Sequence, residues 1–294
     1  MNLIRMAIAS ILKVASLPAF AELPNADPSG KTFMWRAERG GTTLYLLGSI
    51  HALKEDAYPL PSVIDDAFAE VEVAVFEIDL DDMTTAAIKM MTAGSLDPGT
   101  RLEQVVGPQL WSEFTAHVAG TSFQPSFFQG MKPWMAALTL TAFELTNQGY
   151  VSTAGLDSHL SQRAKESGKE RQALETAEYQ VSLFAELTPE QSLAFFRYSL
   201  TDLETIIPEM DKLYLDWRSG KVEPVEQLLL EGFEEFPEVF ERMVVDRNRA
   251  WMPQIEKLLA GDRDAMVVVG SMHLVGEAGL VSLLREKGYT VEQL

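Results

Sequence analysis

A segment near the start of the chain, residues 44–51, returns near its end as residues 266–273. The first copy reads Leu-Tyr-Leu-Leu-Gly-Ser-Ile-His and the second Met-Val-Val-Val-Gly-Ser-Met-His. In each copy an apolar run of strand length ends at a glycine, and a histidine follows three residues later. A glycine there allows a sharp turn or the close approach of another group. We therefore expect two strands that present His51 and His273 at the edge where open α/β sheets place their sites. The alternative is that both imidazoles only bond within the fold.

The segments around the two copies predict a sheet made from both ends of the chain. Alternating or β-branched runs and turn signals predict strands at residues 33–38, 42–47, 71–80, 265–270 and 290–293, the first two joined as a hairpin through Arg39-Gly40-Gly41. Helical periodicity broken by Gly and Pro fills residues 83–253, and further helices are expected after Ser62, as N-cap, and over residues 280–287. The expected fold class is mixed α/β, or α+β: a small central sheet with a large helical insertion between the two Gly-x-x-His motifs. We expect residues 32–294 to form a single domain.

The first residues have the pattern of a signal peptide. Arg5 precedes a mostly apolar run over residues 6–20, and Ala19-Phe20-Ala21 offers small residues where a signal peptidase cuts. We expect cleavage after Ala21, a flexible lead over residues 22–31, and a periplasmic or secreted protein. The run is too short, and too interrupted by Lys13, to predict a membrane span, and we expect no stable membrane insertion once it has been cleaved off. The alternative is an uncleaved amphipathic start.

The charge of the chain restricts its partners. The 294 residues include 43 acidic and 24 basic side chains, a formal net charge of −19. Such a surface repels nucleic acid and anionic lipid, so no nucleic-acid partner is expected. There is no cysteine, and any metal site must therefore use His, Asp, Glu and water. The sequence predicts no oligomeric state.

Glu77 is an acidic residue inside the apolar strand predicted at residues 71–80. The two-residue period places it on one face with Val73, Val75 and Asp79. A carboxylate there is costly unless it is paired or bound to a metal. If this strand lies beside the two repeated strands, Glu77 and the two imidazoles converge as a three-ligand site with room for water. The alternative is that Glu77 lies at a frayed strand end in contact with solvent.

The whole set of motifs resembles the TraB/GumN family, which is related to the Tiki proteins. The resemblance covers nearly all of the chain after the leader, in the same order. It is carried by the two Gly-x-x-His motifs and by Tyr58-Pro59-Leu60-Pro61, Phe76-Glu77-Ile78-Asp79, Lys132-Pro133-Trp134, Gly155-Leu156-Asp157, Leu174-Glu175-Thr176 with Glu178 and Gln180, and Arg247-Asn248.

The resemblance implies a metal-dependent hydrolase. His51, Glu77 and His273 would hold a divalent ion, manganese or cobalt, and take part in catalysis. Tiki relatives are divalent-metal proteases that cut the amino-terminal end of secreted signalling proteins, so the implied substrate is a peptide or protein. Two other functions stay open: a non-catalytic protein that binds a peptide, a metal ion or a small ligand, and an ester or lactone hydrolase.

Several roles within the implied site stay open as well. Glu77 is either a metal ligand or the general base. Arg247 and Asn248 either orient the substrate carbonyl and its developing charge, or form a pair on a helix surface. Asp157 and Glu175 either orient the histidines or cap helices and form turns.

Overall fold

The structure is a computed structural model that describes residues 30–231, 233 and 237–294. The predicted signal peptide, its cleavage site at Ala21 and residues 22–29 of the predicted lead lie outside these residues. None of the helices in the described ranges is both long enough and apolar enough to cross a membrane.

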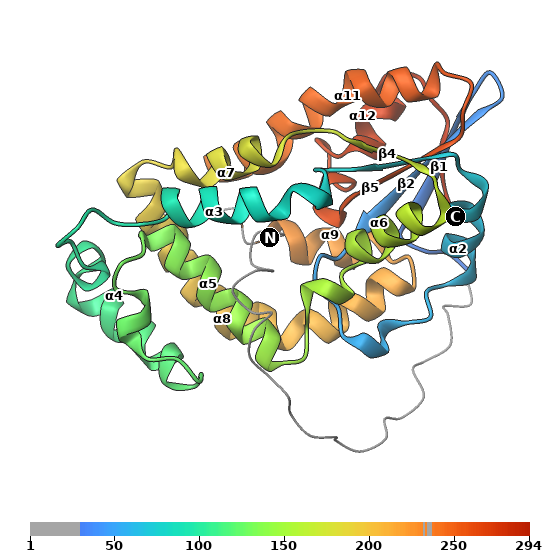
Figure 1. The fold of residues 1–294 in the computed structure, drawn as a ribbon. Helices are drawn as coiled ribbons and strands as arrows, with labels where there is room; N and C mark the ends of the chain where they lie inside the picture. Colours follow the sequence, from blue (N-terminus) through green and yellow to red (C-terminus); the bar gives the residue numbers. More distant parts are fainter. Residues whose placement is uncertain (1–29, 232, 234–236) are drawn as a thin grey trace.

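One six-stranded sheet organises the fold (Figure 1). Its strands are β1 (Met34–Arg39), β2 (Thr42–Ser49), β3 (Val73–Phe76), β4 (Glu170–Ala173), β5 (Ala265–Gly270) and β6 (Val291–Gln293). Their order across the sheet is β4-β3-β5-β2-β1-β6. β4, β3, β5 and β2 are parallel, whereas β1 is antiparallel to both β2 and β6. The predicted sheet made from both chain ends is confirmed, and β5 lies between β2 and β3.

The hairpin between β1 and β2 forms where it was predicted. Gly40 and Gly41 both adopt positive φ, of 59° and 95°, a conformation that glycine reaches without steric cost. Met34 pairs with Leu47 and Arg39 with Thr42 along the hairpin. At the far edge, Ala37 pairs with Val291 of β6. Strands from the two ends of the described chain therefore lie next to each other at one edge of the sheet.

Three details of the predicted elements are wrong. β3 covers only Val73–Phe76, because Asp79 accepts a hydrogen bond from the backbone of Asp81 and turns the chain into a short 3-10 helix. The middle region is largely helical but also contributes β4, an edge strand that was not predicted. Ser62 is the first residue of its helix, whose N-cap position is held by Pro61.

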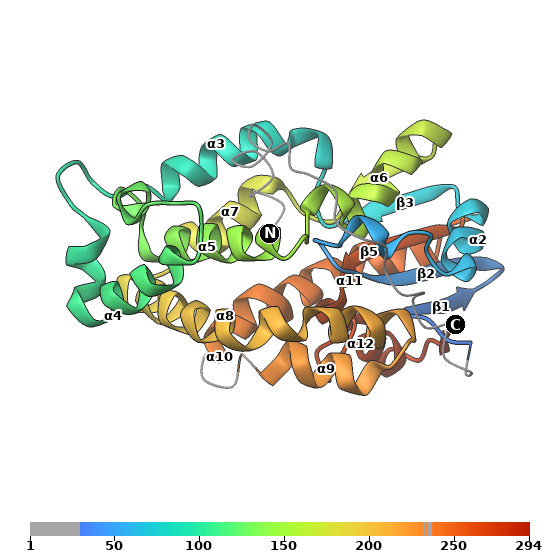
Figure 2. The ribbon, with the colours of Figure 1, turned by 90° about the horizontal axis from the view of Figure 1, so that it is seen from below.

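Helices cover both faces of the sheet and continue beyond it (Figures 1 and 2). α6 contacts β3 and β4, while α11 contacts β1 and β2. The helices α3, α4, α5 and α7 form a helical part beside the sheet. The α-helices are α2 (Ser62–Glu70), α3 (Met83–Ala93), α4 (Leu102–Ala119), α5 (Pro133–Asn147), α6 (Leu156–Ser167), α7 (Ala177–Ala185), α8 (Pro189–Arg218), α9 (Val222–Glu231), α10 (Pro237–Phe240), α11 (Asp246–Leu259) and α12 (Leu280–Glu286). A π-helical turn, η6 (Glu241–Val245), joins α10 to α11.

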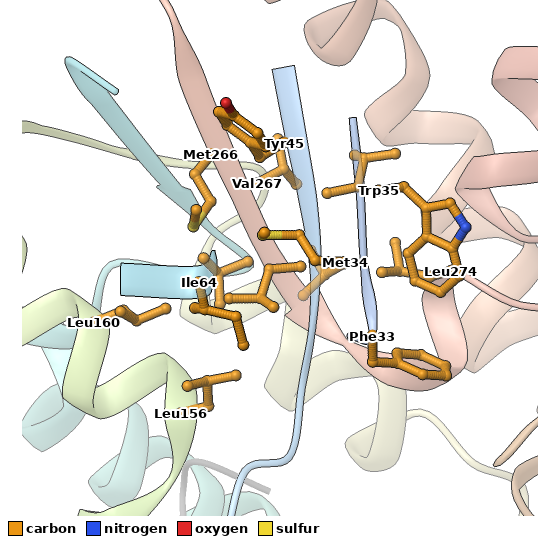
Figure 3. Packing of buried hydrophobic residues seen from close by; sticks show 14 of the residues in the cluster. Phe33, Met34, Trp35, Tyr45, Ile64, Leu156, Leu160, Met266, Val267 and Leu274 are labelled. Atoms are coloured by element: carbon orange, nitrogen blue, oxygen red, sulfur yellow. The ribbon is translucent and has the colours of Figure 1, made fainter. Parts of the chain in front are cut away.

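The core is continuous across the sheet (Figure 3). Leu156 and Leu160 of α6 approach one face, while Trp35 and Leu274 lie on the other. The long helix α8 links this core to the helical part. Near its start Phe196 is buried among the residues of α4 and α5, and near its end Trp217 donates a hydrogen bond of 2.7 Å to the carbonyl of Gly48.

Candidate functional site

His51, Glu77 and His273 meet at the carboxyl edge of the parallel strands. Each follows its strand within a few residues: β2 ends at Ser49, β3 at Phe76 and β5 at Gly270. Glu77 Oε1 lies 3.8 Å from His51 Nε2 and 4.0 Å from His273 Nε2. The convergence predicted from the sequence is therefore present, although Glu77 stands just beyond its strand rather than within it. Glu77 is largely shielded from solvent, since the residue is 9% exposed.

The two copies of the repeated motif pair with an offset of one residue. Gly270 is opposite Ser49, and Gly48 is opposite Val269. A Cβ on Gly48 would meet the Phe33 ring at 2.5 Å, so this glycine makes room for core packing. A Cβ on Gly270 would lie 3.0 Å from His51 Nε2 and 3.4 Å from Glu77 Oε1. The second glycine therefore keeps open the space that the three polar side chains share.

Glu77 is held as an anion by both of its oxygens. Oε1 accepts a hydrogen bond of 2.7 Å from the backbone N–H of Gly270. Oε2 accepts bonds from Arg247 Nη2 at 2.6 Å and from Gln180 Nε2 at 3.0 Å. Burial by itself raises the pKa of Glu77, but the charge of Arg247 and the two imidazoles hold it far below its ordinary value.

Arg247 has a partner for each of its five N–H groups. Nε and Nη2 both bond to Glu175, Nη2 also bonds to Glu77, and Nη1 bonds to the carbonyl of Met243 and to His273 Nε2. The guanidinium also lies 4.7 Å from the ring centre of Trp251. In this arrangement no N–H of Arg247 is left to bind a substrate, so its immediate effect is to position Glu77 and His273.

His273 is fixed at both ring nitrogens. Nδ1 lies 2.7 Å from Asn248 Oδ1, while Nε2 lies 3.0 Å from Arg247 Nη1. Because an arginine can only donate, Nε2 must accept and the proton sits on Nδ1. Burial, with the adjacent Arg247 charge, lowers the pKa of His273 to about 3. Asn248 Nδ2 also donates to the carbonyls of His273 and Ala278, which anchors the turn after β5.

His51 is more open than His273, with 23% of its side chain exposed against 6%. Its Nδ1 faces Asp157 Oδ1 at 3.3 Å, and within the described chain this nitrogen makes no hydrogen bond of regular geometry. Burial lowers the pKa of His51, but the carboxylates of Asp157 and Glu77 outweigh it and leave the pKa above its ordinary value.

The buried charges around the site do not balance. The side chains of Glu77, Glu175 and Asp157 are at most 10% exposed, and Arg247 is the cation buried with them. With both imidazoles neutral, two negative charges remain in excess. Burial raises the pKa of Glu175 above its ordinary value, and the charge of Glu77 adds to this against the pull of Arg247. An arrangement of this kind favours an added cation or proton.

The part of the chain that matches known proteins includes the residues of this site. The family model described as the TraB/PrgY/gumN family matches residues 33–293, which include both Gly-x-x-His motifs, Glu77 and Arg247-Asn248. The chain belongs to this family. It is 26% identical over 246 residues to the uncharacterized protein YbaP of Escherichia coli K12, covering 84% of this chain and 89% of the relative, and the figures are the same for YbaP of Shigella flexneri. No solved structure matches the chain.

In this TraB/PrgY/GumN member, the residues expected to support the site have distinct positions. Arg247 and Asn248 are 7% and 0% exposed, so the helix-surface alternative is wrong. Asp157 faces His51 and also lies in the first turn of α6. Glu175 contacts neither histidine through a hydrogen bond; it binds Arg247 and accepts from Trp251 Nε1 at 3.0 Å.

Two contacts of the site in this family member were not predicted. Gln180 on α7 donates to Glu77, and Trp251 lies beside His273 with ring centres 4.5 Å apart and ring planes inclined at 48°. Gln180 belongs to a motif that carried the resemblance, but nothing in a lone helical glutamine indicates its partner. Trp251 lies four residues after Arg247 on α11, and this helical spacing placed both on one face.

Proposed function

We propose that this protein is an exported metal-dependent hydrolase that cleaves peptide bonds in peptides or at protein termini. One observation carries the proposal: His51 Nε2, Glu77 Oε1 and the edge of the His273 ring converge beside Gly270, inside a cluster with an excess of buried negative charge. His51, Glu77 and His273 would hold the ion, manganese or cobalt. Export depends on the leader over residues 1–21.

The donor set fits a divalent ion in its chemistry. Imidazole and carboxylate are the ligands available to a chain without cysteine, and each imidazole has an oxygen facing its Nδ1, as metal-binding histidines usually do. Two ligand atoms that share an ion at about 2.1 Å lie about 3.0–3.5 Å apart. The distances of 3.8 and 4.0 Å are longer, and within the described residues no group of three such side chains is already spaced to hold an ion. Binding therefore requires small inward movements and the release of His273 Nε2 from its hydrogen bond with Arg247 Nη1.

The residues of the chain have separable tasks in this mechanism. A bound divalent ion supplies Lewis acidity, which polarises the scissile carbonyl and makes water a better nucleophile. Glu77 keeps Oε1 directed at the shared space while Arg247 and Gln180 hold Oε2, and this carboxylate would either bind the ion or take the proton of the attacking water. Substrate enters beside His51, the more exposed of the two imidazoles.

The test is metal binding by the purified protein without its leader. Calorimetric titration with Mn²⁺ and Co²⁺ should show one site per chain, and His51→Ala, Glu77→Gln and His273→Ala should each abolish binding while circular dichroism stays native. His117→Ala, on α4 and outside the site, is the matched control and should bind like the wild type. Peptide-library cleavage by the loaded protein, lost in the same three variants, then tests hydrolysis. Wild-type protein that binds neither ion would rule out this mechanism.

A second candidate function is a non-catalytic binding protein, and Arg247 is the observation that favours it. The hydrogen bonds from Arg247 to Glu77 and His273 hold the cluster together without any ion. A protein that binds peptide by calorimetry but releases no product with either ion would support this candidate.

A further inference from the structure

The segment Gly155-Leu156-Asp157 packs against the first Gly-x-x-His motif, and each of its residues contacts one motif residue. A Cβ on Gly155 would lie 2.1 Å from the carbonyl oxygen of His51, so only glycine permits this approach. Leu156 donates its backbone N–H to the carbonyl of Ile50 at 3.1 Å. The backbone N–H of Asp157 donates to Ser49 Oγ at 3.2 Å.

The same contacts place the buried carboxylate of Asp157 beside Nδ1 of the His51 ring. Asp157 is 4% exposed. Its Oδ1 accepts a hydrogen bond of 3.1 Å from Ser49 Oγ and lies 3.3 Å from His51 Nδ1. Ser49 thus bonds both the backbone and the side chain of Asp157, which fixes the carboxylate relative to the motif that carries the histidine.

The second motif copy uses a different partner. His273 Nδ1 is bonded to the amide oxygen of Asn248, from α11, and Ser271 Oγ donates to the carbonyl of Ser49 instead of holding an acid. The two imidazoles of the repeat therefore have unlike supports, an anion behind His51 and a neutral amide behind His273. A carboxylate that faces one ring nitrogen makes the other nitrogen more basic, and so a stronger metal ligand, than an amide does.

We infer that Gly155-Leu156-Asp157 is the positioning element of His51, and that Asp157 keeps the ring proton on Nδ1 so that Nε2 faces Gly270 and Glu77. A ring nitrogen that faces a carboxylate at short range carries the proton, because an ionised carboxylate can only accept, and Asp157 Oδ1 lies 3.3 Å from His51 Nδ1. This part of the inference needs no metal. Its consequence for a bound cation rests on the function proposed above: Asp157 would strengthen binding through His51.

The experiment determines the tautomer of the His51 ring by NMR of metal-free protein that carries ¹⁵N-labelled histidine. At a pH above the raised pKa of His51, this residue, assigned through His51→Gln, should show a protonated Nδ1 and an unprotonated Nε2, with His117 and His159 as internal references. Asp157→Ala should change the His51 pattern and no other. Asp157→Asn, which retains an oxygen acceptor, should preserve it. Asp65→Asn is the matched control, because it removes the Asp65–Arg163 ion pair between α2 and α6 without touching His51.

The outcomes separate this inference from the proposed function. A wild-type spectrum with the proton on His51 Nε2 would overturn it, even if Asp157→Ala does not fold. So would a folded Asp157→Ala protein with an unchanged His51 pattern. Co²⁺ affinity should fall about 10–100-fold in Asp157→Ala and stay unchanged in Asp65→Asn. If the wild type binds no Co²⁺, the proposed function fails while the tautomer result still decides the role of Asp157.

Discussion

Nη1 of Arg247 lies 3.0 Å from Nε2 of His273, the ring nitrogen that faces Glu77. One guanidinium therefore contacts both His273 and Glu77, since Nη2 of the same side chain bonds to Glu77 at 2.6 Å. Charge pairing in a buried cluster stabilises the fold only while each partner is present. The behaviour of this cluster can be tested before any substrate is known.

Arg247→Met should lower the free energy of unfolding by about 3–5 kcal/mol, because it leaves Glu77 and Glu175 buried without their cation. Urea unfolding followed by circular dichroism measures the change. Arg249→Met on the same helix is the control: its side chain is 64% exposed in its ion pair with Glu241, and the expected loss is below about 0.5 kcal/mol. Equal losses in the two variants would contradict the interpretation of Arg247.

The two motif glycines should respond differently to alanine. Gly270→Ala should weaken Co²⁺ binding more than about tenfold with little change in stability, because its φ of −50° suits alanine and the new methyl group enters the shared space. Gly48→Ala should instead cost about 1–3 kcal/mol of stability through overpacking against Phe33. Calorimetry and urea unfolding measure the two effects. Gly130→Ala, with open space around its Cβ, is the neutral control, and native Co²⁺ affinity in Gly270→Ala would refute the assignment of that space.

Asp216 should stabilise the fold in a pH-dependent way. Burial alone raises its pKa, but hydrogen bonds from Lys212 and Lys221 bring the pKa below the ordinary 3.8. A carboxyl whose pKa is depressed on folding contributes stability above its unfolded pKa and loses it as the pH falls through the folded value. Asp216→Asn should therefore cost about 1 kcal/mol at pH 7 and progressively less below pH 3.8.

Urea unfolding at pH 7 and pH 3 makes this comparison. The exposed Glu113, bonded to Gln109, provides the control variant Glu113→Gln, for which the change at pH 7 should stay within about 0.5 kcal/mol. A cost of Asp216→Asn that is the same at both pH values would show that packing, not charge, is what Asp216 contributes.

Export should leave a chain that begins at Glu22. The prediction rests on the apolar run before Ala21 and on Ala19 and Ala21 at the positions a signal peptidase reads. Mass spectrometry of the protein recovered from the periplasm or medium identifies its first residue. Recovery of soluble cytoplasmic protein that still begins with Met1 would contradict it.

The sheet was largely predictable because its strands carry their own signals. β5 coincides with the predicted residues 265–270, and the β1–β2 hairpin was indicated by Gly40 and Gly41. β4 was missed because Glu170–Ala173 has no apolar run: this edge strand pairs on one side only and is half exposed. A strand held mainly through its backbone leaves little trace in the sequence.

The site was predictable in its members and not in its contacts. The spacing of the repeat placed His51 and His273 at one edge, and Glu77 was conspicuous as an acid among apolar residues. Which partner stands behind each histidine depends on α6 and α11, whose docking on the sheet no local pattern encodes. For that reason Asp157 stayed ambiguous between orienter and helix cap.

The position of β5 between β2 and β3 determines when the site comes into being. The strands β2 and β3 are synthesised long before residues 265–270. The position between them in the sheet therefore stays unfilled until β5 has been made. Insertion of β5 joins segments about 200 residues apart in the sequence, which makes it a slow, late event in folding. His51, Glu77 and His273 can therefore come together only after the last strands of the chain have been made.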